Sequence, residues 1–331
     1  MVSRQGRARV LVLACGASLL MLTGRASAFC RMTACDPTQE MCPRDAATGC
    51  LTVGEPLSWS SDCVDIYVQG DGAPSQGITW QDAQASLQRA FDAWLHTDCG
   101  GAPPSLQVNV QGPIGCHQVE YNSKAHNANI SMFREQDWPY PDAIDAIGST
   151  KPSFALDGPG EIWDADIELN AYEFMFSVDG VSPGEDLDSV LTHEVGHWLG
   201  LDHSRDSSAT MFAKYGGGTG LRTLADDDEA AICAIYPPGR AVATHSCEPR
   251  HGFSDRCAAD QPPGEAIDPE PQTIDGACAF SARRGPAPLG GVALVSLLLL
   301  GWRRRRRSAT TIRRIPKPDA TSSPHSTSLG M

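Results

Sequence analysis

The chain has 331 residues, of which 41% are hydrophobic, so it is long enough for a large domain and apolar enough to build a core. Between residues 29 and 277 it carries 12 Lys and Arg against 39 Asp and Glu, an acidic balance that excludes nucleic acid and anionic membranes as partners of this region. Its twelve cysteines are too many for an ordinary cytosolic protein.

The N-terminus has the three parts of a secretory signal peptide within residues 1–28. Arginines precede an apolar run over residues 10–22, and Ala26-Ser27-Ala28 forms a cleavage site of small residues. The apolar run is short for a membrane anchor. We therefore expect cleavage before Phe29 and export of the remaining chain.

Ten of the twelve cysteines lie between the signal peptide and residue 278, and an even number is typical of disulfides in an oxidising compartment. Five of them fall within residues 30–63, which predicts a stapled, loop-rich segment over residues 29–56. Spacing alone leaves the connectivity open. The simplest local pairs are Cys99–Cys116 and Cys233–Cys247.

The first half of the body alternates between strand-like and helical patterns. Alternating apolar residues predict a strand within residues 57–69. Thr79 and Asp82 form a capping-box pattern ahead of apolar residues at helical spacing, which predicts an amphipathic helix that ends before Gly100. Two further strands are expected at residues 105–110 and 128–133.

Residues 134–160 are rich in Pro, Asp and Gly, and we expect a loop there. A cleanly alternating strand follows over residues 161–170 and places Asp164, Asp166 and Glu168 on one face. We expect this acidic face to be solvated, although clustered carboxylates are also ligands for Ca²⁺.

Two helices, over residues 185–200 and 224–236, are expected to complete a domain that spans residues 57–237. Beyond it the chain is Pro-rich and acidic, which predicts a linker over residues 238–277.

The first of these two helices carries a run of histidines in the pattern H-E-x-x-H-x-x-G-x-x-H. His193 and His197 are four residues apart, so both imidazoles point from the same side of the helix and can reach one ion. Gly200 can adopt the left-handed conformation that ends a helix. The chain can then turn back and bring His203 to the same ion.

Glu194 lies beside these ligands and cannot easily bind the same ion, so it is placed to take a proton from metal-bound water. Three histidine nitrogens leave the fourth position of tetrahedral zinc open, as a catalytic site requires. A structural zinc would need a fourth protein ligand, and no cysteine lies within the motif.

The extended motif resembles that of the metzincin metalloendopeptidases, and the residues after it resemble the matrixins. Ser204 follows the third histidine, and residues 209–215 are similar to the matrixin Met-turn and the pocket wall beyond it. The resemblance implies that Met211 forms an apolar floor under the zinc and that Tyr215 belongs to the pocket wall. Residues 224–236 resemble the closing helix of the family.

This resemblance implies an α+β fold with a mixed twisted sheet, an active-site helix, a Met-turn and a closing C-terminal helix. The implied activity is zinc-dependent hydrolysis of protein or peptide substrates, which pair as extended strands beside the active site. Asp164 and Asp166 resemble an acidic stretch that carries calcium ligands in matrixins. Ala213 stands where the family usually has Pro, and the family's structural-zinc pattern is absent around His117 and His126.

The C-terminal region has a Cys, a short apolar run and an arginine cluster, in that order, within residues 278–307. This order resembles the myxobacterial-type sorting tail of surface proteins, which implies a processing enzyme that recognises Cys278 and removes the helix. A retained anchor is the alternative, although the apolar run 288–302 falls short of the ~20 residues of a membrane span. A polar tail over residues 308–331 follows.

Two other functions fit parts of the chain: a metzincin-fold surface adhesion module with little turnover, and a surface structural protein. The intact Glu194 and the open zinc position argue against the first, and the second leaves the histidine motif unexplained. The sequence therefore favours an exported zinc endopeptidase at the cell surface or in the medium.

Overall fold

The computed structural model describes residues 28–35, 41–119, 121–156, 158–181, 183–258 and 278–282, with backbone only for the last range. The expected signal peptide up to residue 27, residues 259–277 of the expected linker and the chain beyond residue 282 lie outside these residues. Within the described part, no helix has the length and apolar character needed to cross a membrane.

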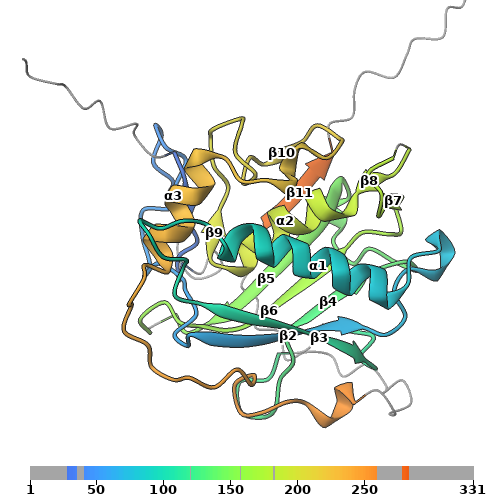
Figure 1. Ribbon diagram of the computed structural model, residues 1–331, viewed down its shortest axis with the longest axis horizontal. Coiled ribbons are helices and arrows are strands. Elements are labelled where there is room, and N and C mark those ends of the chain that lie inside the picture. The colour runs from blue at the N-terminus through green and yellow to red at the C-terminus, as the bar shows by residue number, and fades with distance from the viewer. Residues whose placement is uncertain are drawn as a thin grey trace, which may run out of the picture. The chain divides into compact units, whose positions relative to one another are not determined.

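The fold is built on one mixed seven-stranded sheet (Figure 1). In spatial order its strands are β10 (Lys214–Tyr215), β11 (Cys278–Ala282), β5 (Ala146–Phe154), β6 (Ile162–Leu169), β4 (Ile130–Phe133), β2 (Cys63–Gln69) and β3 (Gln107–Ile114). The four strands from β6 to β3 are parallel, whereas β5 is antiparallel to β6. The expected α+β class with a mixed sheet is confirmed.

Two small sheets flank the large one. Strand β1 (Cys30–Arg31) pairs antiparallel with β9 (Leu201–Asp202), and β7 (Phe176–Ser177) pairs parallel with β8 (Glu185–Asp186). The first pair brings the start of the chain next to the segment that follows the active-site helix.

Helices α1 (Trp80–Leu95) and α2 (Leu187–Trp198) pack side by side, α1 against β2 and β3 and α2 against β5 and β6 (Figure 1). Helix α3 (Asp226–Ile235) closes the domain. The expected capping box at the start of α1 is confirmed: Asp82 N donates to Thr79 Oγ1 over 3.2 Å, and Thr79 N donates to Asp82 Oδ2 over 3.0 Å.

Buried tryptophans lock the helices to each other and to the sheet. Trp94 Nε1 on α1 donates to Thr192 O on α2 over 2.8 Å, and Trp198 Nε1 on α2 donates to Ala165 O on β6 over 3.0 Å. Each indole therefore fills the core and satisfies its polar N–H at the same time. Removing one of these side chains typically costs about 3–5 kcal/mol of stability.

The expected loop over residues 134–160 is wrong in its second half, where the chain forms strand β5. Gly148 and Pro152 interrupt any alternating pattern, so no local signal marks this strand. Its pairing with β6 on one side and β11 on the other supplies the ladder that holds it extended. Tertiary pairing here overrides local preference.

The acidic face of β6 is also not solvated as expected, because Asp164, Asp166 and Glu168 are all buried. Asp166 Oδ1 accepts a hydrogen bond from Ile130 N over 2.8 Å, and Glu168 forms a buried ion pair with Arg134 at 2.5 Å. Asp166 and Glu168 therefore bind neighbouring segments of the chain, as buried charges generally require such partners.

Five disulfides cross-link the domain. They are Cys30–Cys50, Cys35–Cys42, Cys63–Cys247, Cys99–Cys233 and Cys116–Cys257. The expected local pairs Cys99–Cys116 and Cys233–Cys247 are wrong, because cysteines that are near in sequence lie on different elements. Cys99 follows α1 and bonds to Cys233 on α3, so this bridge joins two helices instead of closing a short loop.

The first part of the expected linker, residues 238–258, is fixed to the domain and is not a free linker. Cys247 and Cys257 tie residues 238–258 to the domain. Thr244 and Phe253 add isolated β-bridges, to Ser61 and Asn127 respectively.

Candidate active site

Helix α2 is buried along its whole length, so each of its side chains is packed against neighbouring residues. Its N-terminus is capped by Asp186, whose Oδ1 accepts from Ser189 N over 2.9 Å. Arg222 Nε donates to the same Oδ1, also over 2.9 Å. A capped and buried helix is a rigid support for ligands four residues apart.

The structure brings the three expected ligands together. Ligand atoms of His193, His197 and His203 all lie within 4.8 Å of one another, and this is the one such cluster of His, Cys, Asp or Glu among the described residues. Nε2 of His197 and Nε2 of His203 are 3.2 Å apart. The three rings therefore converge on one point.

Hydrogen bonds on the far side of two rings orient the histidines. His193 Nδ1 lies 2.6 Å from Thr210 O and His197 Nδ1 lies 2.8 Å from Leu201 O. A carbonyl only accepts, so each Nδ1 carries the proton and each Nε2 presents its lone pair to the centre. Burial lowers the pKa of both, and lowers the pKa of His203 to about 3, so all three are neutral, the form that binds a metal.

The turn after α2 depends on Gly200, which has a φ of 97°. A Cβ at this position would lie 2.6 Å from Leu57 O, so only glycine combines this conformation with this approach. The backbone then pairs Leu201 and Asp202 with β1, which sets the start of the segment that carries His203.

Glu194 is buried beside the histidines and is held by β5. Its Oε2 accepts a hydrogen bond from Thr150 Oγ1 over 2.6 Å, whereas its Oε1 has no hydrogen-bond partner among the described residues. A Cβ on Gly148 would lie 2.7 Å from Oε1, so glycine is needed at this point of β5. Burial raises the pKa of Glu194 to about 8, although the Thr150 hydrogen bond lowers it.

The residues of the expected Met-turn pack against helix α2, the helix that carries His193 and His197. Met211 is buried and contacts the position where a Cβ on Gly196 of α2 would lie. Asp228 on α3 holds the turn, because its carboxylate accepts from Thr210 N over 2.7 Å and from Met211 N over 3.1 Å. Helix α3 therefore positions Thr210, whose carbonyl in turn orients His193.

Tyr215 lies on β10, an edge strand of the large sheet, and its ring is buried. Its hydroxyl donates to Gly218 O over 2.6 Å and accepts from Asp186 N over 3.2 Å. This side chain thus joins β10 to Asp186, the N-cap residue of α2.

A second carboxylate of α3 connects the segment after His203 to Ala28 and Phe29, the residues on either side of the expected cleavage site. Asp227 Oδ1 accepts from Ala28 N over 2.7 Å and from Phe29 N over 3.1 Å, while Ser204 Oγ donates to its Oδ2 over 2.7 Å. Ser204 directly follows His203. Asp227 therefore links the expected cleavage site to the residue that follows the third histidine.

Sequence reasoning missed several residues that shape this site: Gly148, Thr150, Asp227 and Asp228. The first two lie on the strand that was expected to be a loop. The two aspartates stand in an acidic run that is also typical of a helix N-terminus, so no sequence signal separated their roles.

The expected calcium residues are not part of the triad. Asp164 and Asp166 lie on β6 and are buried, and they belong to no group of metal-ligating side chains that the described residues bring together. Cys278 lies on β11, at the edge of β5.

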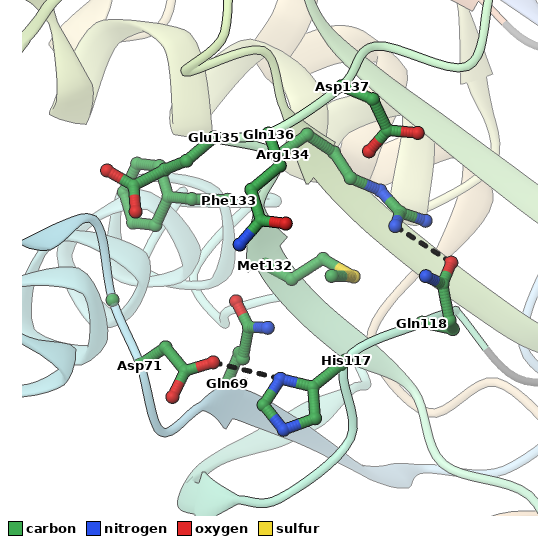
Figure 2. A pocket seen from close by; sticks show the side chains of 11 residues that line it. Gln69, Asp71, His117, Gln118, Met132, Phe133, Arg134, Glu135, Gln136 and Asp137 are labelled. Atoms are coloured by element: carbon green, nitrogen blue, oxygen red, sulfur yellow. Dashed lines mark hydrogen bonds and ion pairs between the residues drawn. The ribbon is translucent and has the colours of Figure 1, made fainter. Parts of the chain in front are cut away.

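A separate pocket of about 400 Å³ lies near the ends of β2 and β4 (Figure 2). His117 Nδ1 forms an ion pair with Asp71 at 2.9 Å, and Arg134 Nη1 donates to Gln118 Oε1 over 2.8 Å. No residue of the histidine motif lines this pocket, so it is distinct from the candidate active site.

Comparisons with known proteins agree with this geometry. A family model described as Matrixin matches residues 59–237. Human matrix metalloproteinase-19 is 43% identical over 159 residues, which cover 46% of this chain and 26% of that protein. Probable matrix metalloproteinase 095L of invertebrate iridescent virus 3 is 34% identical over 103 residues, covering 30% of this chain and 27% of that protein.

A bacterial relative is more distant but aligns over a longer stretch. Karilysin of Tannerella forsythia is 26% identical over 184 residues, which cover 54% of this chain and 33% of karilysin. The chain therefore spans about a quarter to a third of the length of these curated relatives.

Proposed function

Because the chain belongs to the matrixin family, we propose that it is an exported zinc endopeptidase that hydrolyses peptide bonds of extracellular proteins, with Glu194 as general base. The observation that carries this proposal is the buried triad of His193, His197 and His203 beside the Glu194 carboxylate. Three neutral imidazole nitrogens in a convergent arrangement suit Zn²⁺ and leave a fourth position for water.

When bound, zinc supplies a Lewis acid that polarises the scissile carbonyl and makes water a nucleophile at neutral pH. The rest of the work falls to side chains of this chain. Thr150 holds Oε2 of Glu194, so Oε1 is the oxygen that can receive a proton. Glu194 then passes this proton to the nitrogen of the leaving amine, which completes hydrolysis without a net change in the enzyme.

Met211 and Tyr215 have supporting roles in this proposal. Met211 is the apolar floor beneath the three histidines, and it carries no ligand function. Tyr215 belongs to the wall strand β10, where it shapes the pocket for a substrate side chain. The substrate is a protein or peptide that adds an extended strand beside β5.

The decisive experiment compares the rate of casein cleavage by the Glu194→Gln variant with that by the unaltered full-length protein. We expect Glu194→Gln to bind zinc and fold, yet to lose roughly 10²–10⁴-fold in activity, the usual value of general-base assistance. Glu173→Gln changes an exposed carboxylate and serves as the matched control. Near-normal turnover by Glu194→Gln, or chelator-resistant cleavage by the unaltered protein, would contradict the proposal.

Export, tail processing at Cys278 and calcium binding at Asp164 and Asp166 stay predictions. The mass of the mature protein tests the first two, since export with processing removes residues 1–28 and the arginine cluster. Calcium binding predicts a thermal midpoint that rises with millimolar Ca²⁺ but not Mg²⁺. This rise should shrink in Asp164→Asn.

A further inference from the structure

Strand β11 occupies an unusual place for a segment so near the C-terminus. In the strand order it lies between β5 and β10, and it belongs to the same compact unit as the rest of the sheet (Figure 1). It runs antiparallel to β5 and parallel to β10. Without it, the described strands would leave β5 as an open edge that faces β10.

The register places β11 directly beside the catalytic carboxylate. Phe280 pairs with Gly148, and Cys278 pairs with Thr150. These two residues of β5 lie next to Glu194. The Thr150 hydroxyl donates a hydrogen bond to its carboxylate, and Gly148 leaves room for that carboxylate because it has no Cβ. The backbone of β11 therefore pairs with the two β5 residues that flank Glu194, whose Oε1 has no hydrogen-bond partner among the described residues.

The other side of β11 pairs with the wall strand. Ser281 pairs with Lys214 and Ala282 pairs with Tyr215, and the register of β11 on β5 shifts between Phe280 and Ser281. A segment paired on both sides is held in the extended form in which peptides add to a sheet edge. Main-chain hydrogen bonds provide this binding, so it does not require a particular side chain.

From these placements we propose that the chain is a substrate of its own active site and that one of the two peptide bonds of Phe280 is hydrolysed. The proposal rests on the proposed endopeptidase activity. Water adds across the bond: its hydroxyl joins the carbonyl carbon, and its remaining proton goes to the nitrogen, which leaves as an amine. The products are a body that ends at residue 279 or 280 and a released C-terminal peptide.

The tether allows this reaction within one molecule. Cys257 is fixed to the domain by its disulfide with Cys116, and Cys278 lies 21 residues further along the chain. An extended chain of this length spans at most roughly 70 Å, ample to reach the active site of the same domain. Such tethering gives the segment an effective concentration of the order of millimolar.

Cleavage at this place has two consequences. It separates the acidic body from the apolar run 288–302 and from Arg303 to Arg307, so the body is no longer joined to the C-terminal segment that resembles a sorting or anchor tail. It also separates the residues of β11 after the cut from the body. The position between β5 and β10 then becomes available to other peptides.

The test follows the full-length protein by intact mass and by N-terminal sequencing of the released peptide. We expect the unaltered protein to yield a body that ends at residue 279 or 280, and Glu194→Gln to stay uncut under the same conditions. The cleaved fraction at a given time should be unchanged over a roughly 100-fold dilution, because the tether sets the local concentration.

Two proline variants test whether the cut occurs in β11. Phe280→Pro removes a backbone N–H from β11 and should abolish the cut, whereas Thr273→Pro, outside the strand, should leave it intact. Both variants should cleave casein, which shows that each is folded and active.

The outcomes separate this inference from the proposed function. If the protein cleaves casein but is not cut at Phe280, the inference is wrong and the endopeptidase proposal stands. The same holds if the Glu194→Gln protein is cut at Phe280, because another enzyme must then make the cut. A cut that slows in proportion to dilution overturns its intramolecular character. Loss of casein cleavage in the unaltered protein would reject both proposals.

Discussion

The two sides of the active site are assembled from the chain in opposite ways. One side comes from the eleven consecutive residues between His193 and His203, on a buried helix and the turn that follows it. The other side joins β5, β10 and β11, which are separated by tens of residues in sequence. The comparison teaches that neighbouring residues on one helix can bring the three histidines together, whereas the contacts of the Glu194 carboxylate and the proposed substrate position depend on distant strands.

Replacing a ligand on the local side should have the largest effect. In His203→Ala two histidines remain, and we expect zinc content and casein cleavage to fall to background. Loss of an outer-sphere partner already costs roughly 10–100-fold, and a direct ligand costs more. Metal analysis of the purified protein measures this, with the exposed His96→Ala as control.

Full zinc retention by His203→Ala would show that the turn after Gly200 does not complete the site. Only the two histidines of the helix would then be local ligands, and at least one further ligand would have to come from a distant part of the chain.

Removing the support of the Met-turn should come next. Asp228→Ala leaves the buried N–H groups of Thr210 and Met211 without their acceptor, and each such loss costs about 1–3 kcal/mol. We expect a lower thermal midpoint, by about 2–4 °C for each kcal/mol lost in a domain of this size. Glu229→Ala, exposed on the same helix, is the matched control.

Equal thermal midpoints for Asp228→Ala and Glu229→Ala would mean that α3 does not hold the turn. If the proposal is right, Asp228→Ala should also bind zinc more weakly, because Thr210 O orients His193.

The smallest of these effects is expected on the distant side. Thr150→Val removes the hydroxyl that holds Oε2 of Glu194, and hydrogen bonds to charged groups are worth about 1.5–3 kcal/mol. We expect kcat to fall roughly tenfold or more, with zinc content unchanged. Steady-state kinetics on a peptide substrate measures this.

Thr150→Ser keeps the hydroxyl and should restore most of the lost rate. A Thr150→Val protein with normal kcat, or a Thr150→Ser protein as slow as Thr150→Val, would show that β5 contributes packing only. The strand would then matter for substrate pairing and not for the carboxylate.

Sequence reasoning succeeded where the relevant contacts repeat over short distances. The capping box of Thr79 and Asp82 and the histidines of α2 follow from helical periodicity, which needs only a few neighbouring residues. It failed at β5, because a strand that contains Gly148 and Pro152 has no alternating pattern. It also failed for the acidic face of β6, whose burial depends on partners about 30 residues earlier in the chain, such as Ile130 and Arg134.

The sequence was enough to predict the convergence of the three histidines, because this depends on spacing along one helix and its turn. It was also enough to predict the family, and through the family resemblance the α+β class. Only the tertiary structure decided which cysteines pair, that Thr150 and Gly148 contact Glu194, and that Asp228 carries the Met-turn. It alone placed Cys278 to Ala282 beside β5. The physical reason is that strand pairing and disulfide formation join residues far apart in the chain, and their partners are set by the packing of the whole domain.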